Sequence, residues 1–90
     1  MSSGIIPRSG HRRGFLEIVE CILKACRAGA KKKTRLMYAA NLNWAQLNKY
    51  LNFLMEKGLL EHVSERDEYV LTKKGARLLR ACKELRKLFS

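Results

Sequence analysis

Three polar side chains near the middle of the chain, Asn43, Gln46 and Lys49, are of types that recognise nucleic-acid bases. Asparagine and glutamine amides can pair with adenine through two hydrogen bonds, and lysine can donate to guanine or to a phosphate. A spacing of three residues places these side chains on the same side of a helix. An ordinary solvated helix surface could have the same composition, so the surrounding elements must decide between the two interpretations.

A run of cations, Lys31, Lys32, Lys33, Thr34 and Arg35, precedes this face. It stands where a short helix over residues 34–40 is predicted to begin, and the positive end of the helix dipole disfavours cations there. A bound phosphate would remove this conflict, because lysine side chains, the threonine hydroxyl and free backbone N–H groups could all point at it. A merely solvated loop is the alternative, but the position favours a phosphate contact.

The formal net charge of +11 in 90 residues favours a polyanionic partner, either nucleic acid or an anionic membrane surface. By count, the net charge is +7 over residues 1–35, −2 over residues 36–71 and +6 over residues 72–90. The basic residues therefore lie towards the two ends. No run of about 18 apolar residues is present, so no membrane-spanning helix is predicted.

Apolar periodicity predicts helices over residues 15–28, 34–40, 44–57 and 73–89, with short strands over residues 60–64 and 68–71. Thr34, Asn43 and Thr72 are the expected N-caps. In the third helix Trp44 is expected to face inward with Leu47, Leu51, Leu54 and Met55. This order predicts a mainly α fold with a small β-hairpin, a winged helix-turn-helix. Arg66 is the basic residue at the tip of the hairpin, and its neighbours are acidic.

We expect residues 14–72 to form this domain and residues 73–90 to form a basic amphipathic helix. Residues 1–13, which include His11, Arg12 and Arg13, are expected to be a flexible basic arm or the remnant of an engineered linker. The apolar stripe of the last helix either completes the core or packs against the same helix of a second copy. Its predicted contacts in a homodimer are Leu78, Cys82, Leu85 and Phe89.

The remaining residues indicate no catalytic or metal site. Cys21, Cys26 and Cys82 are odd in number and have no zinc-ligand spacing, so they are expected to be buried thiols in a reducing, intracellular compartment. There is no paired-carboxylate motif, no glycine-rich phosphate loop and no nucleophile beside a base. No enzyme activity, cofactor, metal or small-molecule substrate is predicted.

Four segments carry a resemblance to a known family: KTRLMYAANL at 33–42, AQLNKYL at 45–51, EKGLL at 56–60 and LTKKG at 71–75. Together they make residues 16–85 similar to archaeal winged-helix DNA-binding proteins, which include predicted transcriptional regulators and the small basic chromatin proteins of Sulfolobus. The resemblance implies that Lys33, Thr34 and Arg35 touch the DNA backbone and that Asn43, Gln46 and Lys49 face the major groove. It also implies a homodimer formed through the C-terminal helix.

The sequence therefore predicts a double-stranded DNA-binding protein, cytoplasmic and nucleoid-associated, that acts as a transcriptional regulator or as a chromatin-type protein. Two alternatives stay open. One is a winged helix that binds RNA or the ribosome. The other is a protein-interaction module in which an exposed Phe53 and the acidic hairpin form the contact.

Overall fold

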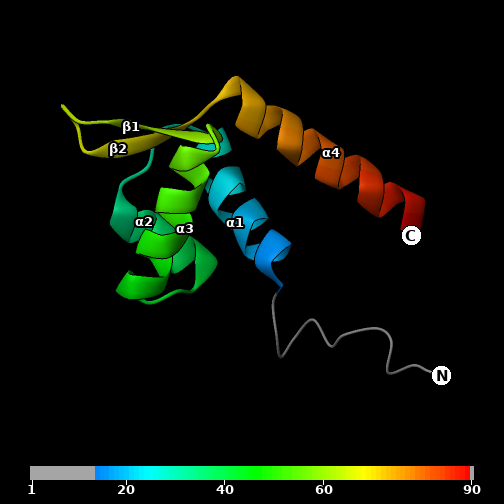
Figure 1. The fold of residues 1–90 in the computed structure, drawn as a ribbon, viewed down its shortest axis with the longest axis horizontal. Helices are drawn as coiled ribbons and strands as arrows, with labels where there is room; N and C mark the ends of the chain where they lie inside the picture. The colour runs from blue at the N-terminus through cyan, green and yellow to red at the C-terminus, as the bar shows by residue number, and fades with distance from the viewer. Residues whose placement is uncertain (1–13, 90) are drawn as a thin grey trace.

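The computed structural model describes residues 14–89, which form four helices and one hairpin (Figure 1). The predicted order is confirmed, and each boundary differs from the predicted one by at most one residue. The predicted N-terminal arm, residues 1–13, lies outside the described residues. In chain order the elements are α1 (Phe15–Arg27), α2 (Lys33–Ala40), α3 (Trp44–Glu56), β1 (Leu60–Val63), β2 (Glu68–Leu71) and α4 (Lys73–Phe89).

The first three helices pack around one apolar core, with the hairpin at one end (Figure 1). Helix α4 starts beside the hairpin and runs past α1, so that its C-terminal end and the hairpin tip lie at opposite ends of the view. The core is built mainly from the apolar sides that the sequence periodicity predicts for α1, α2 and α3. The fully buried side chains are Val19, Ile22, Leu23, Leu36, Leu47, Leu51, Leu54 and Leu60.

Two aromatic residues lie differently from the prediction. The helical spacing of Phe15 with Ile18 and Ile22 predicts a place on the buried face of α1. Phe15 is instead about half exposed, because it is the first residue of the helix. Its ring stacks on Tyr50 and meets Phe53 edge-on, with centroids 5.5 and 5.1 Å apart. Phe53 is therefore partly buried by an intramolecular contact. The hypothesis of a partner site on an exposed Phe53 is wrong in this respect.

Two asparagines determine the turn between α2 and α3. Asn41 ends α2 in the left-handed region with φ of 54°, a conformation that asparagine adopts more readily than most residues. Asn43 then caps α3, since its side-chain oxygen accepts a hydrogen bond from the backbone N–H of Gln46 at 2.8 Å. The predicted cap on α3 is confirmed. The predicted cap on α2 is wrong, because the helix begins at Lys33 and Thr34 lies inside its first turn.

The hairpin is antiparallel, with Leu60 paired with Leu71 and Val63 with Glu68. A third segment joins it, which the sequence did not reveal: Lys31 forms an isolated bridge with Tyr69. The Lys31 N–H donates to the Tyr69 carbonyl at 3.0 Å, and the Tyr69 N–H donates to the Lys31 carbonyl at 2.8 Å. This bridge fixes the start of α2 against the hairpin.

Helix α4 is held at both ends. At its start Thr72 accepts a hydrogen bond from the Gly75 N–H at 2.9 Å and donates one to the Gly58 carbonyl at 2.7 Å, which confirms it as the cap. Near its end Arg86 donates to Glu20 on α1. Glu20 is only 5% exposed, so this ion pair satisfies a carboxylate that would otherwise be costly to bury.

The cysteines are free thiols, and Cys26 and Cys82 are buried as predicted. Cys21 is only half-buried, so the prediction of burial is wrong for this residue. Burial raises the pKa of the Cys26 thiol to about 11, which keeps it protonated at neutral pH. No helix in residues 14–89 is long and apolar enough to cross a membrane. The same residues contain no cluster of three or more side chains of metal-binding type.

Candidate nucleic-acid interface

The segment from Lys31 to Met55 contains no acidic residue and five basic ones. It forms α2, the turn and nearly all of α3. All eight acidic residues of the chain lie elsewhere, on α1, at the end of α3, on the hairpin or on α4. We call the surface of this segment the helix-turn-helix face. Its charge is entirely positive, a signal that was visible in the sequence.

The three consecutive lysines at the edge of this face do not act as one cluster. The ammonium of Lys31 donates to the Gly29 carbonyl at 3.3 Å, and its backbone pairs with β2. Lys32 reaches in another direction and donates to the carbonyl of Arg66 at the hairpin tip, at 2.6 Å. Lys33 turns towards α3. In the sequence the three lysines form one continuous run, and only the structure shows that their side chains point in different directions.

The first turn of α2 is suited to an anion. Its N-cap, Lys32, supplies no side-chain acceptor, and the turn contains no acidic residue. The N–H groups at a helix start need acceptors, and the helix dipole favours negative charge there. Thr34 and Arg35 are exposed in this turn. A backbone phosphate placed here would accept from N–H groups and pair with neighbouring cations.

On α3, the two predicted base-reading amides are used within the protein. Asn43 and Gln46 form a reciprocal capping box, in which the Gln46 side-chain oxygen accepts from the Asn43 N–H at 3.0 Å and the Asn43 oxygen accepts in return. Bidentate pairing with adenine needs the amide oxygen as well as the NH₂ group. Both amide oxygens already accept hydrogen bonds from backbone N–H groups, so only the NH₂ groups lie outside the capping box. Lys49 and Asn52 remain exposed further along the helix.

Trp44 is a third aromatic residue that lies differently from the prediction. It was expected in the core, but it is 49% exposed on the helix-turn-helix face. Its position is the first of α3, beyond the end of the buried stripe that begins at Leu47. The Lys33 ammonium lies over its ring, 5.0 Å from the centroid. This contact connects the start of α2 to the start of α3.

The family model described as "Winged helix-turn-helix" matches residues 12–90, nearly the whole chain. The chain belongs to the winged helix-turn-helix family.

Three relatives support this assignment. Uncharacterized protein MJ0287 of Methanocaldococcus jannaschii is 35% identical over 75 residues, which are 83% of this chain and 75% of the relative. Uncharacterized protein MJ0290 of the same organism is 37% identical over 78 residues, and these are 86% of this chain but 36% of that longer protein. The crystal structure of Sso10a-2, a DNA-binding protein from Sulfolobus solfataricus, superposes with a TM-score of 0.75 at 35% identity, covering 84% of this chain and 81% of that one.

In winged-helix terms the β1–β2 hairpin is the wing, and its charges are largely paired with one another. The Arg66 guanidinium contacts the Glu68 carboxylate at 3.0 Å. His62 lies 2.8 Å from Asp67, and this hydrogen bond lowers the pKa of the Asp67 carboxyl below its ordinary value. Arg66, the one cation predicted to bind DNA from the wing, is therefore partly neutralised by its own strand.

Glu68→Gln is expected to strengthen DNA binding about two- to fivefold at low salt. The substitution removes the carboxylate that holds Arg66, so the guanidinium can contact a phosphate, and it removes one repulsive charge. Glu61→Gln is the matched control, because it removes the same charge from the adjacent strand and leaves the Arg66 pair intact. Duplex titrations of both variants would measure the difference. Equal effects of the two substitutions would show that freeing the Arg66 guanidinium from Glu68 adds no contact with DNA.

Proposed function

We propose that this protein binds double-stranded DNA through its helix-turn-helix face, with little preference for sequence, as a chromatin-type protein. The observation that carries the proposal is the charge of that face, with five basic and no acidic residues between Lys31 and Met55. DNA carries a dense row of phosphates, and neutralising them releases bound counterions. The description of Sso10a-2 as a DNA-binding protein, at 35% identity, is consistent with this role.

Phosphate contacts are assigned to the beginning of α2. Lys32 and Lys33 are the leading cations, with Thr34 and Arg35 in the exposed first turn. Lys31 is a weaker candidate, because its backbone is paired with β2 and it is less exposed than Lys32. Lys49 supplies a further cation from the outer face of α3.

A low sequence preference follows from the capping box. Sequence is read by side chains that reach base edges, whereas phosphate contacts only position a protein on the duplex. Asn43 and Gln46 have their amide oxygens engaged at the helix start, which leaves Lys49 as the main predicted base contact. This balance favours general packaging of DNA, in the nucleoid, over the recognition of one operator.

A competition experiment tests the proposal. One fluorescent duplex is bound to the protein and then displaced by unlabelled random DNA, genomic DNA of the source organism or a structured RNA hairpin. We expect random and genomic DNA to compete equally per base pair, and the hairpin to compete more weakly. Preferential displacement by specific genomic fragments would instead indicate a regulator, and preferential displacement by RNA would contradict duplex binding.

The homodimer remains a proposal, and α4 is the element that would form it. Of the predicted contacts, Cys82 is buried within the chain and Leu78 is partly buried, whereas Leu85 is 49% and Phe89 86% exposed. Leu88 is 78% exposed beside them. Such large apolar side chains at the end of a helix are costly in water and typical of a contact between subunits.

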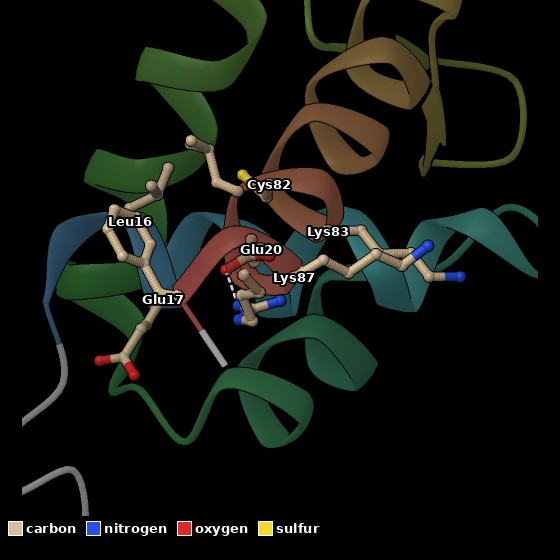
Figure 2. A pocket seen from close by; sticks show the side chains of 9 residues that line it. Leu16, Glu17, Glu20, Cys82, Lys83 and Lys87 are labelled. Atoms are coloured by element: carbon tan, nitrogen blue, oxygen red, sulfur yellow. Dashed lines mark hydrogen bonds and ion pairs between the residues drawn. The ribbon is translucent and has the colours of Figure 1, made fainter.

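A groove of about 620 Å³ lies next to these side chains, between α1 and α4 (Figure 2). Leu16 lines it from α1, and Leu85 and Phe89 line it from α4. Glu20 lies in the groove with its ion pair to Arg86 drawn as a dashed line in Figure 2. We propose that the C-terminal turns of α4 from a second copy cover this apolar surface.

Replacing both Leu88 and Phe89 with serine is expected to convert the dimer to a monomer. The substitutions remove exposed apolar area and leave the described core untouched. Light scattering after size-exclusion chromatography at micromolar protein would measure the mass. Arg77→Ser with Arg80→Ser is the control, since it alters exposed polar positions of the same helix that do not line the groove. A monomeric wild-type protein would contradict the proposed dimer.

A further inference from the structure

Trp44 presents a large apolar surface in the middle of a cationic face. It is the single tryptophan of the chain and is 49% exposed. The core begins only one turn later, at Leu47, so the indole contributes little to the packing between helices. Tryptophan is usually largely buried in folded proteins, and an exposed one needs a partner to remove it from water.

The Lys33 ammonium places a positive charge next to this aromatic surface. Its ammonium lies 5.0 Å from the centre of the ring, within the range of a cation–π contact. The contact orients Lys33 towards α3 and away from the neighbouring Lys32, which reaches the wing. None of the four ion pairs formed within residues 14–89 involves Lys33. Its charge is therefore held in place outside any ion pair, and the Asp67 carboxylate of the hairpin tip interacts with it only at longer range.

The pair offers an apolar plane beside a fixed positive charge. The backbone of a DNA strand matches this pair, because each negative phosphate is bonded directly to a deoxyribose whose C–H surface is apolar. The segment from Lys31 to Met55, which contains both residues, has no acidic side chain that would repel a phosphate. The start of the second helix of a helix-turn-helix is also where such proteins enter the major groove, close to its sugar–phosphate wall.

We propose that Trp44 and Lys33 together form a sugar–phosphate contact, in which the indole packs on a deoxyribose and the ammonium pairs with the adjoining phosphate. The contact is independent of base sequence and anchors the first turn of α3 at the edge of the major groove. It rests on the proposed binding of duplex DNA and adds a nonpolar element to a surface otherwise described by its charge.

The two halves of the contact predict different salt responses. Trp44→Ala is expected to lower duplex affinity about tenfold at every salt concentration, because it removes an apolar contact and no charge. Lys33→Met keeps the alkyl chain and removes the ammonium, so it is expected to reduce the slope of log affinity against log salt by about 1. Trp44→Phe is expected to retain most of the affinity, since it keeps an aromatic plane.

Wild-type fluorescence supplies a test that does not depend on a folded variant. Because Trp44 is the sole tryptophan, acrylamide quenching reports its exposure directly. A duplex of about 20 base pairs is added to the full-length protein, and binding is followed in parallel by the anisotropy of a label on the DNA. We expect the quenching constant to fall at least twofold as the duplex binds.

Two outcomes would overturn the proposal, and they are distinguishable. If the anisotropy rises but quenching of Trp44 is unchanged and Trp44→Ala binds as tightly as the wild type, Trp44 is not at the interface and DNA binding itself stands. If the wild-type protein produces no rise in anisotropy, both the contact and the proposed function are wrong.

Discussion

Replacing Lys32, Lys33 and Arg35 together with glutamine is expected to weaken duplex binding by two to three orders of magnitude at about 0.1 M salt. Each phosphate contact contributes about 0.9 to the slope of log affinity against log salt, so the loss of three contacts is expected to reduce that slope by about 2.7. The three cations stand at the start of α2, whose first turn contains no acidic residue, and the nearest opposing charge is the Asp67 carboxylate at the hairpin tip, which forms no ion pair with them. Anisotropy titrations at several salt concentrations measure both quantities.

A charge-matched control separates this effect from the net charge of the protein. Lys24, Arg27 and Lys83 lie on α1 and α4, where they line a second pocket together with Glu20. Their replacement with glutamine removes the same number of positive charges. We expect that variant to lose less than about tenfold in affinity and to change the slope by less than 1. Equal losses in the two triple variants would mean that binding follows overall charge and not the helix-turn-helix face.

Gly75→Ala is expected to destabilise the fold, although it adds only one methyl group. A methyl group at this position would lie 2.3 Å from the Leu59 carbonyl oxygen and 2.6 Å from the Leu71 side chain. Because the first obstacle is backbone, α4 must shift away from the hairpin. Overpacking of this kind typically costs about 1–3 kcal/mol or somewhat more, against a gain below about 1 kcal/mol from alanine's helix propensity. For a chain of this size we expect Tm to fall by about 10 °C.

Gly14→Ala is the matched control for this prediction. Gly14 is also next to a helix, but the nearest atom to an added methyl group is 4.0 Å away and belongs to the flexible Glu17 side chain. Its effect on the free energy of unfolding should stay below about 1 kcal/mol. Thermal unfolding followed by circular dichroism would compare the two variants. A Gly75→Ala protein that melts within about 2 °C of the wild type would show that the close approach of α4 to Leu59 is dispensable.

The order and limits of the helices could be predicted because they depend on local signals. Apolar spacing gave the buried faces of α1 and α3, and Asn43 and Thr72 act as caps through hydrogen bonds to residues only three positions away. The hairpin was predictable for the same reason, since its two strands are joined by a short polar turn. Such interactions involve neighbours in sequence and leave a recognisable pattern.

The details of the interface depend on contacts between distant residues, which single-sequence patterns do not encode. Lys31 pairs with Tyr69, and Lys32 reaches the Arg66 carbonyl, so the apparent lysine run is divided by the wing. Trp44 satisfied the helical spacing of core residues, yet it lies beyond the edge of the packed elements.

The most direct measurement of the central claim is the salt dependence of duplex binding by the wild-type protein. A labelled duplex of about 20 base pairs is titrated at salt concentrations from about 50 to 200 mM. Contacts by Lys32, Lys33, Arg35 and Lys49 predict a slope of about −3.6 per protomer, so the affinity should fall about a hundredfold across this range. A slope close to zero, or the absence of duplex binding at the lowest salt, would contradict the assignment of the helix-turn-helix face as a DNA-binding surface.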